Sequence, residues 1–88
     1  MAYTVILATK TTQAQVEALT PGEFDALMEV FETLRLVPAN GEKLKRTAPD
    51  GTAMRLITHR GLEVIYLVIE HAAQVVVIRV NRLPTLEN

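Results

Sequence analysis

Two β-branched runs joined by a very short link constrain the fold of this chain more than any other feature. The runs are LEVIYLVIE (residues 62–70) and QVVVIRV (74–80), and only HAA separates them. Val, Ile and Tyr favour strands, and a connection this short joins neighbouring strands in antiparallel order. A third run, TAMRLITH (52–59), leads into the first through the short turn HRG. These runs predict a three-stranded antiparallel meander.

The amino-terminal part carries one further strand and a short helix. YTVILA (3–8) is β-branched and apolar on both faces, which predicts a central strand buried from two sides. TQAQVEAL (12–19) predicts a short helix, with either Thr11 or Thr12 as its amino-terminal cap.

A longer helix has a clear start and a clear end. In the stretch TPGEF, Thr20 suits the N-cap, Pro21 the first helical position and Glu23 the third, where it completes a capping box. Apolar residues then recur at helical spacing and form one stripe: Phe24, Leu27, Met28, Phe31 and Leu34. Pro38 ends the helix near Leu36, because the residue before a proline is driven out of the helical region.

The order strand, helix, helix, strand, strand, strand predicts an α+β domain, with a two-helix hairpin packed on one face of a mostly antiparallel sheet. The chain has 88 residues, so residues 1–88 are expected to form a single domain. NGEKLKRTAPDG (40–51) is rich in turn-forming residues and is expected to be a loop. Tyr66, in the middle of an apolar run, is expected to lie in the core or to be a half-buried neighbour on the sheet.

The composition argues against several kinds of site. The chain has no cysteine and no serine, which removes disulfides, thiolate metal sites and the commonest nucleophiles. His59 and His71 fall in turns without the spacing of a ligand set, so neither a metal nor a cofactor is expected. No apolar run approaches the length of a membrane helix and no leader-like segment opens the chain. A cytoplasmic protein without membrane contact is therefore expected.

The net charge of −1 hides an uneven distribution. Residues 1–41 carry a net −3, residues 42–60 a net +3, and residues 61–88 a net −1. The basic residues that follow the helices are Lys43, Lys45, Arg46, Arg55, Arg60, Arg79 and Arg82. A basic loop beside arginine-bearing strands suits the phosphates or carboxylates of a partner. The alternative is a solvated surface that keeps the protein soluble.

One long stretch resembles a known family. KLKRTAPDGTAMRLITHRGLEVIYLVIEHAAQVVVIRVNR (43–82), with the opening YTVILATKTTQAQVEAL, resembles the RelE/ParE superfamily of bacterial type II toxin–antitoxin modules. Gly61, Val64, Ile65 and Tyr66 stand at matching places in the segment after the KL element. The resemblance covers nearly the whole chain. It implies the RelE/ParE-like fold: an N-terminal strand, a two-helix hairpin and a three-stranded antiparallel meander.

The resemblance also implies a toxin that an antitoxin protein wraps and neutralises. Members of the RelE-like branch are endoribonucleases, or mRNA interferases, that cut mRNA in the ribosomal A site and bind RNA through basic residues. Members of the ParE-like branch poison DNA gyrase. The expected targets are therefore ribosome-bound mRNA or DNA gyrase. If the chain is an active enzyme, it is expected to be an endoribonuclease that needs no metal.

The candidate site residues follow from matching the family residue by residue. Arg55 and Arg82 are the candidate catalytic residues, because the nuclease branch carries basic residues on the same strand as Arg55 and at the end of the last strand. The candidate binding residues are Lys43, Lys45, Arg46, Arg60 and Arg79.

The chain departs from the family at two places. Glu63 stands where an arginine usually follows the glycine and aromatic residue, and a carboxylate there would repel phosphate. The tail LPTLEN lacks the Tyr or His of the nuclease branch. These departures support an alternative: a non-enzymatic interaction module, either a gyrase-inhibiting toxin or an inactive member that binds an antitoxin. A homodimer joined at a sheet edge or helix face is a further alternative.

Overall fold

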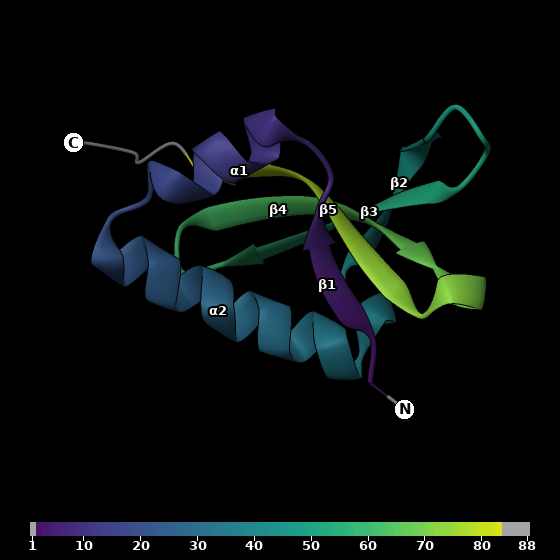
Figure 1. Ribbon diagram of the computed structural model, residues 1–88, viewed down its shortest axis with the longest axis horizontal. Coiled ribbons are helices and arrows are strands. Elements are labelled where there is room, and N and C mark those ends of the chain that lie inside the picture. The colour runs from purple at the N-terminus through teal and green to yellow at the C-terminus, as the bar shows by residue number, and fades with distance from the viewer. Residues whose placement is uncertain (1, 84–88) are drawn as a thin grey trace.

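The computed structural model describes residues 2–83, which form a five-stranded sheet and two α-helices (Figure 1). The elements are β1 (Thr4–Leu7), α1 (Lys10–Glu17), α2 (Pro21–Leu36), β2 (Glu42–Thr47), β3 (Ala53–His59), β4 (Leu62–Ile69) and β5 (Gln74–Arg82), with 3-10 turns at Pro38–Asn40 and Glu70–Ala72. The strand order is β1-β5-β4-β3-β2. β1 is parallel to β5 and the other pairs are antiparallel. The predicted α+β class and the meander, β3-β4-β5, are confirmed.

The sheet has one strand more than the sequence predicted. Residues 42–47, expected in a loop, form β2, in which Glu42 lies opposite Leu56 and Lys43 opposite Arg55 on β3. The register then shifts before Thr47, as it does where a β-bulge interrupts a ladder. The segment has one large apolar residue, Leu44. It therefore lacks the alternation that marks a strand in sequence.

β1 lies at an edge of the sheet, so the prediction of a central strand buried from two sides is wrong. Val5 and Leu7 are half-buried against the core, whereas Thr4 and Ile6 are exposed. This alternation is that of a strand with one face on the core. The sequence did not reveal it, because Ile6 is as apolar as its buried neighbours.

Helix α1 covers the part of β5 that β1 does not reach. β1 pairs with residues 74–77 of β5. Beyond them, the Thr12 hydroxyl donates to the carbonyl of Ile78 at 2.7 Å, and Gln15 Oε1 accepts from the amide of Val80 at 2.9 Å. These side chains satisfy backbone groups that an uncovered sheet edge would leave without a protein partner.

The cap of α1 differs from the prediction. Its N-cap is Thr9, whose hydroxyl accepts from the amide of Thr12, rather than Thr11 or Thr12. Thr12 is instead fully buried against β5. A run of three threonines in four positions offers several equivalent caps, and the contact with β5 selects among them.

Helix α2 begins and ends where the sequence predicted. Thr20 accepts from the Glu23 amide while Glu23 accepts from the Thr20 amide, which is a complete capping box. The helix ends at Leu36, before Pro38. Within residues 2–83, neither this helix nor α1 is long and apolar enough to cross a membrane.

The core lies between α2 and the middle of the sheet. It consists of Ala26, Leu27, Val30 and Leu34 of α2, Leu62, Val64 and Tyr66 of β4, and Val75, Val77 and Val80 of β5. Val16 and Leu19 pack against the same cluster, so α1 and α2 lie on one side of the sheet. The predicted apolar stripe of α2 is only half buried, because Phe24 and Met28 remain 42% and 37% exposed.

The Tyr66 hydroxyl joins the end of α2 to the start of β2. It donates to the Pro38 carbonyl at 2.7 Å and accepts from the Gly41 amide at 2.9 Å. Burial raises the pKa of Tyr66, so the phenol remains a donor. Gly41 allows this approach, because a Cβ at that position would lie 2.5 Å from the Tyr66 oxygen and 2.8 Å from the Leu56 carbonyl. The prediction that Tyr66 lies in the core is confirmed.

Replacing Tyr66 with Phe should destabilise the fold by about 1–3 kcal/mol, because it leaves the buried Gly41 amide and the part-buried Pro38 carbonyl without this partner. Tyr3→Phe is the matched control, since the Tyr3 hydroxyl bonds Glu70 at the surface and its loss should cost less. Urea denaturation measures both. Equal destabilisation by the two variants would contradict the role assigned to Tyr66.

Candidate functional site

The structure divides the predicted site residues into two groups. Arg55, Arg60 and Arg82 form specific contacts within the molecule. Lys43, Lys45, Arg46 and Arg79 are exposed, and none of them takes part in the ion pairs of residues 2–83. Three of the seven cations are therefore bonded within the molecule, and the other four join no ion pair within residues 2–83.

Arg82 connects the end of β5 to the helical layer. Its Nε donates to Glu23 Oε2 at 2.6 Å, and its terminal nitrogen donates to the Ala18 carbonyl at 2.9 Å. Glu23 Oε1 accepts from the Thr20 amide in the capping box. The hydrogen bond from Arg82 is the main cause that lowers the pKa of Glu23 to about 2, and the Thr20 amide adds to it. One carboxylate thus caps α2 and holds a candidate catalytic residue.

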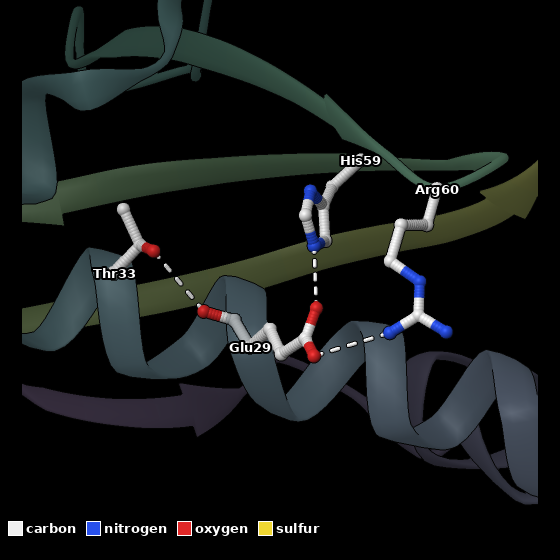
Figure 2. A network of polar contacts seen from close by, with 4 residues as sticks. All are labelled: Glu29, Thr33, His59 and Arg60. Carbon is white, nitrogen blue, oxygen red and sulfur yellow. Dashed lines mark hydrogen bonds and ion pairs between the residues drawn. The ribbon is translucent and has the colours of Figure 1, made fainter.

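Arg60 is held in a similar way at the turn between β3 and β4 (Figure 2). Glu29 of α2 bonds His59 Nε2 at 2.7 Å through one oxygen and Arg60 at 3.1 Å through the other. The hydrogen bonds from His59 and Arg60 lower the pKa of Glu29. Arg60 and Gly61 both have positive φ, 50° and 84°, which is the geometry of a type I′ hairpin turn. The turn and Glu29 together fix the direction of Arg60.

Arg55 binds carbonyl oxygens rather than a carboxylate. Its guanidinium donates to the Gly41 carbonyl at 2.9 Å and makes a longer contact of 3.4 Å with that of Ala39. It lies opposite Tyr66 on one side and Lys43 on the other. Cations directly opposite one another repel, and the carbonyl dipoles offset this repulsion. The positive charge of Arg55 therefore remains beside β2 without being neutralised by an ion pair.

The exposed cations of β2 form the best candidate site, here named the basic edge: Lys43, Lys45 and Arg46, with Arg55 beside them. β2 is the last strand of the sheet, opposite in the strand order to β1. All three side chains of the strand are exposed. Such an edge can bind phosphates or carboxylates. Lysine on an edge strand also deters pairing with other sheets, which is the solvated-surface alternative.

Arg79 lies apart from the basic edge. It is on β5 opposite Ile65, and β4 and β3 separate it from β2. Its neighbours on this face of the sheet include Glu63, which accepts a 3.3 Å hydrogen bond from Asn81. The position where the resemblance implies an arginine thus holds a carboxylate bonded to an amide, on the same face as Arg79.

The histidines do not build a ligand set within the described chain. His59 bonds Glu29, and His71 is exposed in the 3-10 turn before β5. No group of three metal-ligating side chains gathers within residues 2–83.

No sequence pattern identified the carboxylates that bind Arg60 and Arg82. Glu23 and Arg82 are 59 residues apart, and Glu29 and Arg60 are 31 residues apart. No local spacing connects such pairs. The capping box identified Glu23 as a helix-start residue but gave no sign of its second partner.

Comparisons with known proteins identify the fold. No protein-family model and no curated protein matches the sequence. The RelBE2 toxin–antitoxin complex of Mycobacterium tuberculosis has a TM-score of 0.77 at 24% identity, over 93% of this chain and 92% of that chain. The isolated E. coli RelE toxin has 0.74 at 24% identity, over 98% and 89%. The archaeal RelE–RelB complex from Pyrococcus horikoshii has 0.70 at 16% identity, over 93% and 96%.

This chain has a RelE-type fold. The fold that the sequence resemblance implied is therefore confirmed. Within that fold, the β2 cations of the basic edge are exposed. Two other cations that were expected to bind or cleave RNA, Arg60 and Arg82, are held by carboxylates of α2.

The Glu23–Arg82 ion pair should make the free energy of unfolding depend on pH in the acid range. The pKa of Glu23 falls from 4.5 to about 2 on folding, so its contribution is fully present above pH 4.5 and is lost as the pH falls toward 2. Glu23→Gln keeps a capping side chain but removes the charge, so it should reduce the loss of stability between pH 5 and pH 2.5.

Urea denaturation across this pH range measures the effect. Glu17→Gln is the matched control, because it removes a helix carboxylate that joins no ion pair within residues 2–83. If Glu23→Gln and Glu17→Gln changed the acid dependence equally, Arg82 would not be the cause.

Proposed function

We propose that this chain is the toxin-like component of a toxin–antitoxin pair and acts in the cytoplasm by binding its target. The observation that carries the proposal is the RelE-type fold along 93–98% of the chain. Two of the three similar structures were solved as complexes of toxin and antitoxin, which supports an antitoxin as the partner of this chain.

The basic edge is the surface proposed to meet the target. Lys43, Lys45 and Arg46 are exposed on a terminal strand, and Arg55 adds a charge that carbonyl oxygens orient without cancelling. A row of cations on an extended strand suits the repeating phosphates of RNA, and such binding weakens with salt. Ribosome-bound mRNA is the target that this surface favours.

The contacts of the candidate catalytic residues favour binding over strong catalysis. Arg82 is bonded to Glu23 and the Ala18 carbonyl. To stabilise a developing phosphate charge, it would have to leave both partners. Arg55 is better placed, because its partners are neutral carbonyl groups. If RNA is cleaved, we assign charge stabilisation to Arg55 and phosphate binding to the basic edge.

A second candidate function is a non-enzymatic interaction module, either a gyrase inhibitor or an inactive toxin that binds an antitoxin. The observation that favours it is the Glu63–Asn81 pair on the sheet face away from the helices. A carboxylate at this place opposes phosphate binding, whereas it can bond a protein partner.

Inducible expression in a bacterial host tests these functions. The wild-type chain should arrest growth and lower the incorporation of labelled amino acids. Lys43→Ala/Lys45→Ala/Arg46→Ala should relieve both effects at equal protein level, because it removes the phosphate-binding charges. Lys45→Glu should relieve the arrest far more than Lys10→Glu, its matched control on α1.

The other outcomes are equally informative. Arrest with intact translation and DNA-damage signalling would point to gyrase. No arrest at a verified expression level would contradict the toxin function and leave the interaction module. Arrest that the triple variant does not relieve would remove the basic edge from the mechanism.

A further inference from the structure

Helix α2 carries a second row of side chains beside the row that faces the core. It is here named the outer seam and consists of Phe24, Met28, Phe31 and Arg35. These residues follow one another at intervals of four, three and four, which places them on one face of a helix and is the spacing of a two-helix seam. Phe24 is 42% exposed and Met28 37%, whereas Phe31 is half-buried. α2 lies along one border of the molecule, so this row is open to a partner (Figure 1).

A groove adjoins the carboxyl-terminal half of the outer seam. It has a volume of about 500 Å³, and its lining includes Val5, Met28, Phe31 and Arg35. The Tyr3 amide donates to the Arg35 carbonyl at 2.8 Å, so the start of β1 is fixed to the end of α2. The same row of α2 therefore presents a projecting aromatic ring, Phe24, and a hollow with apolar walls two turns further along the helix.

The outer seam is complementary to itself when two copies of α2 lie antiparallel. About the midpoint between Met28 and Phe31, the antiparallel order brings Phe24 opposite Arg35 and Met28 opposite Phe31. A guanidinium is attracted to the face of an aromatic ring, and a thioether sulfur packs favourably against one. Each of these contacts occurs twice, as an interface with two-fold symmetry requires.

We propose that the outer seam is a homodimer interface, in which α2 of one copy packs antiparallel against α2 of a second copy. The Phe24 ring of each copy enters the groove of the other copy, beside its Arg35. The core face of each α2 stays on its own sheet, so the fold of neither copy has to change. This contact goes beyond the proposed function, because it involves neither RNA nor an antitoxin.

The charges beside the outer seam favour the antiparallel direction. Asp25 is exposed next to Phe24 and joins no ion pair within residues 2–83. In the antiparallel order it lies near Arg35 of the second copy, whose guanidinium bonds Glu32 of its own chain at 2.7 Å. A parallel pair would instead bring Asp25 opposite Asp25 and Arg35 opposite Arg35, and like charges across an interface are unfavourable.

A second copy fits this surface better than an unrelated partner, because the projection and the hollow lie on the same helix in the order that two-fold symmetry needs. The seam has only four residues in each copy, and an interface of this size is weak. Association is therefore expected at high protein concentration.

Analytical ultracentrifugation of the full chain, from micromolar to millimolar concentration, tests the proposal without reference to toxicity. The mass of the wild type should rise toward twice that of the monomer. Phe24→Ala, Met28→Lys and Asp25→Lys should each raise the dissociation constant about tenfold or more. Gln13→Lys, at an exposed position of α1, is the matched control and should associate like the wild type. Circular dichroism establishes that each variant is folded.

Disulfide formation tests the direction of the two helices. The chain has no cysteine, so introduced thiols can react only with one another. A mixture of the Phe24→Cys and Arg35→Cys variants should form a mixed disulfide on mild oxidation, because these positions lie opposite one another. Phe24→Cys alone should form little disulfide, since the two copies of position 24 lie about 16 Å apart along the antiparallel axes.

Several results would overturn the proposal. A monomer mass at millimolar concentration would remove the outer seam as an interface. A dimer that Phe24→Ala and Met28→Lys leave as tight as the wild type would lie on another surface. Disulfides of Phe24→Cys with itself that form faster than the mixed ones would contradict the antiparallel order.

Discussion

The buried hydroxyl of Tyr66 fixes the position of the parts that matter for function. It bonds the Pro38 carbonyl and the Gly41 amide at once, so it sets both where α2 ends and where β2 begins. The Gly41 carbonyl then accepts from Arg55. The strand that carries the basic edge thus begins beside the Tyr66 hydroxyl, a buried polar group that both donates and accepts a hydrogen bond. Such groups are costly to disrupt, which makes this junction a rigid support for exposed cations.

The charges of the chain have two different roles. Glu23 of α2 binds Arg82 at the end of β5, and Glu29 of α2 binds His59 and Arg60 at the turn between β3 and β4. These carboxylates therefore connect the helix to the ends of the strands. The cations of β2 have no such partner within residues 2–83. This division explains why a slightly acidic chain can still present a basic edge. It also distinguishes the two edges of the sheet, because the exposed cations lie on β2 and none lies on β1.

The sequence predicted the fold where a local signal decides the structure. The Thr20–Glu23 capping box, the end of α2 before Pro38 and the three β-branched runs all depend on neighbouring residues, and all are confirmed. The edge position of β1 could not be predicted, because Ile6 is exposed in the structure although an isoleucine side chain usually favours burial. β2 was missed because its stability comes from pairing with β3, not from an apolar pattern.

The candidate site was harder to predict than the fold. The basic loop and the arginine-bearing strands suggested one surface, but β4 and β3 lie between Arg79 on β5 and the cations of β2. Contacts over long sequence separations, such as Arg82 with Glu23, then decide which cations are held in ion pairs. Sequence spacing alone carries no information on such partners.

The denaturation midpoint in urea tests this division of the charges most directly. Arg55→Gln and Arg82→Gln should lower the midpoint, because each breaks contacts that hold elements together. Lys45→Gln and Arg46→Gln, which remove the same charge from exposed positions, should leave the midpoint nearly unchanged and the free energy of unfolding within about 0.5 kcal/mol of wild type. A midpoint lowered equally by all four variants, or unchanged in the first two, would contradict the account.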